Sequence, residues 1–217
     1  MSCSICQKRK EKRFCPAVHG RICPQCCGEQ REVTLDCPSD CIYLQLAHQH
    51  EKPRVASELD PALLFPRIEI PEQFIYEQEH LIVGLSFALA KAARKDRSLN
   101  DSDLILALAS MIRTYETYVN SGLHYQEPTT NMVHQAIVAE TQQMIQEYRE
   151  AEAKHLGQAR LRDADVLRAL TFLLRLGYSR TTGRPKSRAF VEFLFGQFPE
   201  KESVIAGAEE GSRLIVP

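Results

Sequence analysis

The sequence contains no tryptophan, and no cysteine follows residue 41. Its longest apolar run, residues 81–90, is about half of the roughly 20 residues that a membrane-spanning helix needs. It has no HExxH motif, no glycine-rich phosphate-binding loop and no nucleophile elbow, so no known catalytic motif stands out. A net charge of −1 predicts no overall attraction to nucleic acid or anionic lipid. The specific chemical signal therefore lies in the first 41 residues.

That segment holds eight cysteines, in two C-x2-C pairs, one C-x3-C pair and two single positions: Cys3, Cys6, Cys15, Cys23, Cys26, Cys27, Cys37 and Cys41. A C-x2-C pair turns two thiolates toward one centre, and two such pairs supply the four sulfurs of a tetrahedral zinc. Eight thiolates fit two zinc ions. Because all-cysteine sites leave no coordination position open for water, we expect structural rather than catalytic ions.

A disulfide framework is the alternative interpretation of the cysteines. Disulfides persist in oxidising compartments, whereas residues 1–20 are rich in cysteine, lysine and arginine and lack the apolar run of a signal peptide. The sequence therefore predicts a cytoplasmic, zinc-binding protein. His19, His48 and His50 are the histidines that can replace a cysteine in the ligand shell.

The adjacent pair Cys26 and Cys27 favours one division of the ligands. Their Cα atoms are about 3.8 Å apart and their side chains diverge, so they serve two ions more easily than one. This predicts a cross-brace with two sets of ligands: Cys3, Cys6, Cys23 and Cys26 on one ion, and Cys15, Cys27, Cys37 and Cys41 on the other. A sequential division of the cysteines along the chain is the alternative.

This alternation of paired ligands resembles the small cross-braced two-zinc fingers of the MYND and HIT types, over about the first 50 residues. Those fingers usually close with a His-x3-Cys pair, while this chain has His48 and His50 after its last cysteine. The resemblance implies binding of a protein partner. The stretches around residues 21–28 and 37–44 also resemble uncharacterised bacterial proteins, which imply no activity.

A basic run occupies residues 8–13, within a cysteine segment that carries seven basic and five acidic side chains. Two zinc ions and eight thiolates bring the loaded segment to a net charge of about −2. The run is therefore predicted to neutralise the thiolate sites, with a nucleic-acid surface as the alternative.

Apolar residues recur with a helical period after residue 71. They predict four helices, near 72–95, 101–120, 129–155 and 163–177, and a fifth that starts at Arg184 and Pro185. Residues 100–103 and Asp163 are the expected N-terminal caps, and Gly177 the expected stop. The fold class is therefore mainly α, with a two-zinc module followed by a bundle of about five helices.

The predicted division is a cysteine module at residues 1–50, a proline-containing connector at 51–71, a helical domain at 72–198 and a tail at 199–217. Residues 67–70 of the connector are predicted to form a short strand. The tail has two interpretations, a short hairpin or no fixed structure.

One basic loop lies between the last two predicted helices. Residues 179–188 contain no acid, and the side chains of Arg180, Arg184, Lys186 and Arg188 suit an anion such as phosphate. The alternative is a solvated interhelix loop.

Three classes of function follow. The first is a structural zinc protein whose helical domain binds another protein, as an adaptor or regulatory partner. The second is nucleic-acid binding through residues 179–188 and the finger. The third is an unrecognised metal-dependent enzyme, whose only candidate ligands are two helical pairs at i, i+3 spacing: Glu77 with His80, and Glu152 with His155.

Overall fold

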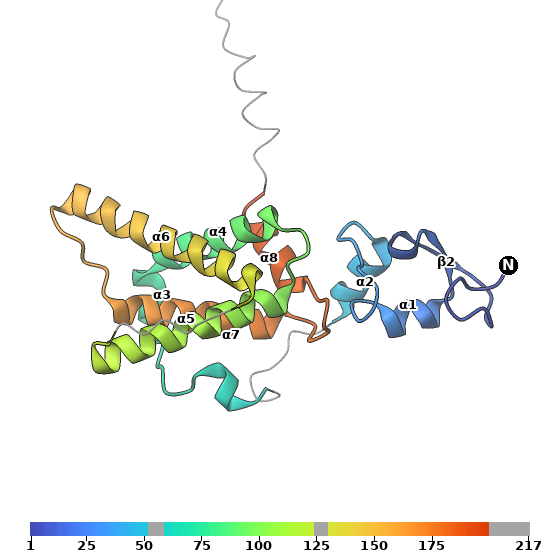
Figure 1. Cartoon of the computed structure of the whole chain (residues 1–217), viewed down its shortest axis with the longest axis horizontal. Helices are drawn as coiled ribbons and strands as arrows, with labels where there is room; N and C mark the ends of the chain where they lie inside the picture. Colours follow the sequence, from blue (N-terminus) through green and yellow to red (C-terminus); the bar gives the residue numbers. More distant parts are fainter. Residues whose placement is uncertain (52–58, 124–129, 200–217) are drawn as a thin grey trace, which may run out of the picture.

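The structure is a computed structural model, and it describes residues 1–51, 59–123 and 130–199. A small cysteine-rich module lies beside a larger helical bundle (Figure 1). The module has one antiparallel hairpin, β1 (Arg13–Cys15) and β2 (Gly20–Ile22), with Arg13 opposite Ile22. A 3₁₀ turn, η1 (Pro16–Val18), links the strands, and two helices follow, α1 (Pro24–Gln30) and α2 (Ile42–His50). The predicted class, mainly α with a cysteine module before a helical bundle, is confirmed.

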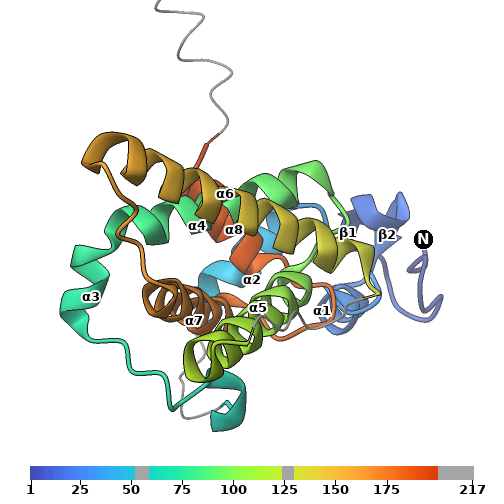
Figure 2. The same ribbon diagram turned by 60° about the vertical axis from the view of Figure 1, so that its left-hand side comes forward.

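The bundle is built from four long helices and two short ones. The bounds are as follows: α3 (Glu72–Glu77), α4 (Glu79–Lys95), α5 (Asp101–Ser121), α6 (Met132–Leu156), α7 (Asp163–Arg180) and α8 (Ala189–Gln197). The most extensive packing is between α5 and α7 and between α4 and α6, as both views show (Figures 1 and 2). None of the helices in the described ranges is long and apolar enough to cross a membrane.

Two separate hydrophobic clusters form the interior. The bundle cluster buries the predicted apolar faces of α4, α5 and α7, with side chains such as Leu85, Leu108 and Leu170 almost completely covered. The module cluster consists mainly of its cysteines with Ile22 and Leu35. The proposed boundaries at residues 50 and 71 stay predictions. Residues 52–58 and 200–217 lie outside the described residues, and the hairpin predicted in the tail falls among them.

The connector forms a 3₁₀ turn, η3 (Pro61–Leu64), and no strand at residues 67–70. The side chain of Arg175, on α7, explains the difference. Its guanidinium donates hydrogen bonds to the carbonyl oxygens of Leu64, Phe65 and Ile68, at 2.8–2.9 Å. These carbonyl groups are satisfied by one arginine instead of a neighbouring strand.

Several predicted helix ends are wrong. The helix predicted at 72–95 is interrupted at Gln78, where no glycine or proline marks the break. Arg162 rather than Asp163 is the N-cap of α7, and the Asp163 carboxylate pairs with Arg149 at 2.6 Å. The cap at Asn100 is confirmed, as a capping box with Asp103.

The last helix begins at Ala189, not at Arg184 and Pro185. Its N-terminal N–H groups are capped from another helix: the buried carboxylate of Asp101, on α5, accepts hydrogen bonds from the backbone of Phe190 and Val191 at 3.0 and 3.1 Å. This distant cap, rather than the proline, sets where the helix starts.

Gly177 does not end α7, which continues to Arg180. A Cβ added at this glycine would lie 3.1 Å from the Phe190 ring and 3.2 Å from Ile105. The missing side chain lets α5, α7 and α8 approach one another closely.

We therefore expect Gly177→Leu to lower the free energy of unfolding by at least about 2 kcal/mol, because the added atoms overpack a filled core. Gly196→Ala is the matched control, since a Cβ at that position in α8 meets nothing within 4 Å. It should raise the free energy of unfolding by about 0.5 kcal/mol. Urea denaturation followed by circular dichroism measures both, and equal effects of the two substitutions would contradict the packing role.

Candidate metal centre

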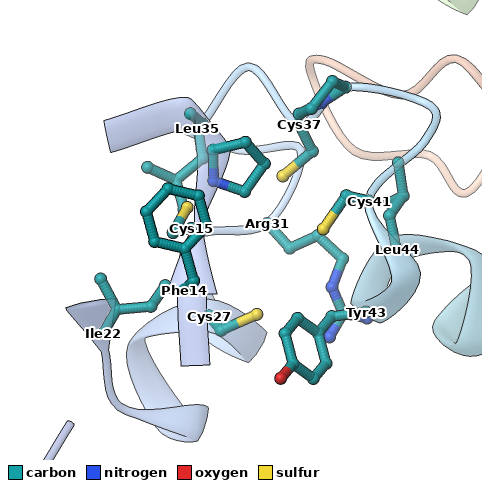
Figure 3. Close-up of a pocket in the computed structure, with 13 residues that line it drawn as sticks. Phe14, Cys15, Ile22, Cys27, Arg31, Leu35, Cys37, Cys41, Tyr43 and Leu44 are labelled. Carbon is teal, nitrogen blue, oxygen red and sulfur yellow. The ribbon is translucent and has the colours of Figure 1, made fainter. Parts of the chain in front are cut away.

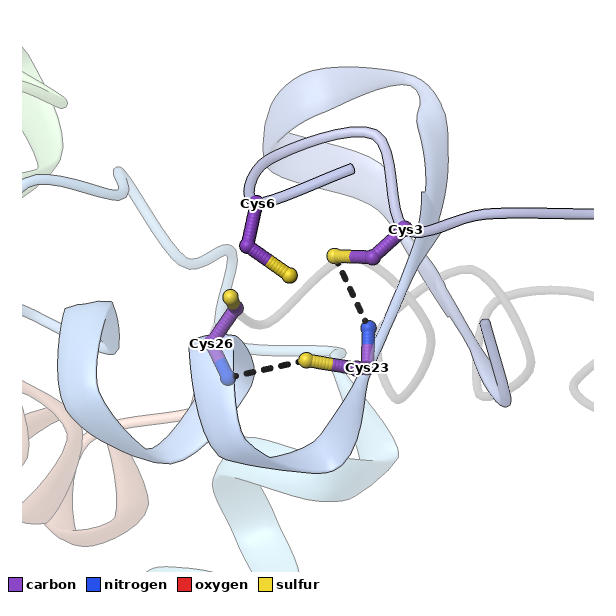
Figure 4. Close-up of side chains that lie close together, drawn as sticks. All are labelled: Cys3, Cys6, Cys23 and Cys26. Carbon is purple, nitrogen blue, oxygen red and sulfur yellow. Dashed lines mark hydrogen bonds between the residues drawn. The ribbon is translucent and has the colours of Figure 1, made fainter. Parts of the chain in front are cut away.

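Four cysteine sulfurs gather in the module. The Sγ atoms of Cys3, Cys6, Cys23 and Cys26 all lie within 4.8 Å of one another and face a common centre (Figure 4). Around a tetrahedral zinc with bonds of about 2.3 Å, neighbouring sulfurs are about 3.8 Å apart. Cys3, Cys23 and Cys26 are 3% exposed or less. The arrangement is that of a metal site with four cysteine ligands.

Backbone hydrogen bonds hold this tetrad in place. Cys23 is the N-cap of α1, and its sulfur accepts a hydrogen bond from the Cys26 backbone at 3.4 Å. The Cys23 backbone donates in turn to the Cys3 sulfur at 3.2 Å. The loop after Cys6 closes through Gln7, whose φ of 54° lies in the left-handed region, and a hydrogen bond from its backbone to the Cys3 carbonyl. Each C-x2-C pair is thus a tight turn whose N–H groups point at sulfur.

The surroundings of the tetrad favour the thiolate form at some of its cysteines and the thiol form at others. Burial raises the pKa of Cys3, but N–H groups of Cys6 and Cys23 outweigh it and lower the pKa to about 6. Burial and the neighbouring sulfurs raise the pKa of Cys26 to about 12. Without a cation the four groups cannot all ionise, because like charges accumulate. A divalent ion removes this conflict.

Arginines from the basic run lie against the sulfurs. A hydrogen bond to the Cys23 side chain raises the pKa of Arg9. Arg13 places Nη1 3.6 Å from the sulfur of Cys27 and stacks its guanidinium on the Tyr43 ring, 4.5 Å from the centroid. These contacts match the prediction that residues 8–13 neutralise thiolate charge.

The other four cysteines line one small pocket of the module. Cys15 comes from the end of β1, Cys27 from α1, and Cys37 and Cys41 from the loop and turn before α2. The sulfurs of Cys27, Cys37 and Cys41 point into the space at the centre of the view (Figure 3). Burial raises the pKa of Cys37, and the sulfurs of Cys15 and Cys41 raise it further. Cys26 and Cys27 therefore face different cysteine groups.

In the described ranges only the first tetrad brings three or more candidate ligand atoms within 4.8 Å of one another, and the four cysteines that line the pocket do not meet that spacing. Glu77 ends α3 while His80 lies on α4, so the expected single helix face is absent. The Glu152 carboxylate accepts hydrogen bonds from the backbone of Arg160 and Leu161 at 2.9 and 2.8 Å. The di-metal arrangement suggested by the sequence is therefore not formed among the residues that the structure describes.

The side chains of the basic loop do not converge on a common point. Arg180 stacks on the Phe193 ring at 4.4 Å, and Arg188 donates to backbone carbonyls before α5, including Leu99 at 2.6 Å. Arg184 and Lys186 reach across to the module. These contacts favour a structural role, and anion binding by the four residues stays a prediction.

The side chains of Arg184 and Lys186 form hydrogen bonds and an ion pair that join the bundle to the module. Arg184 donates to the carbonyls of Gly28 and Arg31 at 3.1 and 2.8 Å, where α1 ends. Lys186 donates to the carbonyl of Thr34 at 3.1 Å and pairs with Asp36 at 2.8 Å. The loop, coloured orange-red, runs toward the module in Figure 1.

Glu32 is the buried centre of this junction, with 2% exposure and a φ of 53°. Its carboxylate accepts hydrogen bonds from Thr182 Oγ1 at 3.3 Å and the Arg188 backbone at 3.4 Å, and it lies 3.2 Å from the ring of His48. Its carbonyl accepts from the Lys186 backbone at 2.7 Å. The sequence does not indicate the central position of Glu32, because an isolated glutamate between cysteines carries no signal of burial.

Comparisons with known proteins add no family to this description. No family model, no curated protein and no solved structure matches the chain.

The pair of His48 and Glu32 predicts a pH dependence. Its hydrogen bond to Glu32 raises the pKa of His48 above the usual 6.5. The stabilisation is therefore fully present below pH 6.5 and is lost as the pH rises through the raised pKa. We expect His48→Gln to lower the free energy of unfolding more at pH 6 than at pH 9, in zinc-saturated protein.

His50→Gln is the matched control, because His50 is exposed on the same helix. Chemical denaturation at the two pH values gives the difference. An equal loss at both pH values for His48→Gln would show that the charged form of the histidine contributes nothing.

Proposed function

We propose that this chain is a zinc protein with two structural ions, whose helical bundle and module together bind a protein partner in an adaptor or regulatory role. The observation that carries the proposal is the buried group of four sulfurs within 4.8 Å. Thiolate ligands select zinc among the common divalent ions, and four of them close its coordination shell. Such an ion has no coordination position open for water or a substrate, so it contributes to folding rather than to catalysis.

The second ion is assigned to Cys15, Cys27, Cys37 and Cys41. Support comes from their position around one pocket and from Arg13 beside Cys27. None of the eight cysteines is paired in a disulfide, which supports the proposed cytoplasmic location.

The partner-binding role is supported by the exposed apolar side chains of the module. Ile42 and Leu46 lie one turn apart on α2 and are 59% and 50% exposed, and Phe14 on β1 is 58% exposed. The junction with the bundle uses the loop after α1 and leaves these side chains uncovered. A resemblance to cross-braced fingers favours the same role.

Zinc content tests the assignment directly. Native mass spectrometry of the full-length chain should show two zinc ions per molecule. Cys23→Ser should remove one ion by breaking the first tetrad, and Cys41→Ser should remove one from the second set. A wild-type chain with a single ion that survives Cys41→Ser would overturn the second site, and a chain with none would overturn both.

Chelation tests whether the metals hold the module alone. We expect zinc removal to unfold residues 1–50 while most helical signal in circular dichroism remains, because the bundle has its own apolar core. Hydrogen exchange should then rise in α1 and α2 and stay slow in α5 and α7. Loss of the whole helical signal would show that the bundle cannot fold without the module.

A further inference from the structure

A polar groove runs along the boundary between module and bundle. One wall is residues 36–39 of the module, and the other is the end of α4, the turn before α5, the basic loop and α8. Binding sites occur preferentially where two structural units meet, because ligand contacts can then come from both. This groove is separate from the pocket lined by the second cysteine set, although Cys37 borders both.

The groove carries more positive than negative charge. Four basic side chains line it, from Arg94, Arg97, Lys186 and Arg188, with two acidic ones, from Asp36 and Glu192. Arg97 is exposed, and Lys186 keeps 37% of its side chain exposed beside its contact with Asp36. An anion in the groove would meet these two cations first.

The groove also has apolar and hydroxyl groups suited to a peptide. Phe195 lies beneath the Arg94 guanidinium, 5.0 Å from the ring centroid, and Pro38 adds apolar surface. Ser39 and Ser98 provide hydroxyl groups. A mixed surface of this kind fits side chains of more than one type.

The two carboxylates decide which anionic partner fits. A nucleic acid presents a phosphate at every step, and Asp36 and Glu192 would repel it along the groove. A peptide can place its acidic side chains opposite the arginines, which bind carboxylates in a bidentate way, and other residues opposite the acids. We propose that this groove binds an acidic segment of a partner protein. The proposal rests on the partner-binding function above and names its surface.

The proposal makes binding depend on zinc. Cys37 lies in the module wall and is assigned to the second ion, so loss of that ion would release residues 36–39 from their position. The acidic peptide should therefore bind the zinc-loaded chain and lose its affinity on chelation.

A labelled octapeptide of alternating glutamate and serine residues tests the groove by fluorescence anisotropy on the full-length, zinc-loaded chain. We expect binding that weakens with salt and that Arg97→Glu weakens about fivefold, since a reversed charge at a partly solvated site has a moderate effect. The Arg97 side chain is exposed, so the substitution should leave the fold intact. Arg67→Glu is the matched control, an exposed arginine in the connector, and should leave the affinity unchanged.

Asp36→Asn provides the reciprocal test. Asp36 is 84% exposed, and loss of its charge should tighten peptide binding about twofold. Absence of peptide binding to the wild-type chain, or equal weakening by Arg67→Glu, would overturn the proposal. So would tighter binding of a single-stranded RNA or DNA octamer that is indifferent to Arg97→Glu.

Zinc content measured on the same samples separates this proposal from the assigned function. A chain with two zinc ions and no peptide affinity refutes the groove alone. A chain that contains no zinc but binds the peptide, with affinity weakened by Arg97→Glu, refutes the metal assignment alone.

Discussion

The convergence of four cysteine sulfurs on one centre is the constraint on which the module, and through it the junction with the bundle, depends. The interior of the module consists mainly of its own cysteines, with few aliphatic side chains to replace them. A segment of about 50 residues buries too little apolar surface to fold on that basis alone. In the zinc protein proposed above, the free energy of metal binding takes the place of a hydrophobic core, and the bundle packs against a module of fixed shape.

The two halves of the chain are joined by short loops with complementary donors and acceptors. The module presents carbonyl groups and the Glu32 carboxylate between two cysteines of the second set, Cys27 and Cys37. The bundle presents the basic loop. Because both ends of the module loop are proposed zinc ligands, the geometry of the junction follows from the geometry of the metal site. Arg184, which the sequence suggests as part of an anion site, donates to module carbonyl groups at this contact.

The periodic parts of the fold could be predicted from the sequence, whereas single contacts between residues distant in the sequence could not. Helical periodicity located the apolar faces of α4, α5 and α7 because packing repeats every turn, and cysteine spacing predicted the first tetrad because two-residue gaps determine the local turn. Local pattern failed where a distant residue decides the outcome. Arg175 donates to the connector carbonyl groups in place of a neighbouring strand, and Asp101 caps the start of α8. The Phe190 ring leaves no room for a side chain at Gly177. None of these partners lies near its target in the sequence.

The cap that Asp101 provides to α8 has a consequence for the order of folding. The carboxylate and the helix start that it caps are 89 positions apart in the chain. Closing so long a loop costs entropy before any contact forms, so helices with local caps, such as α5, are expected to form first. The last helix then assembles on an existing template, and the basic loop, held between this helix and the module, takes its final shape at the end. Assembly of the chain would thus finish at the junction, where the loop after α1 meets the loop before α8.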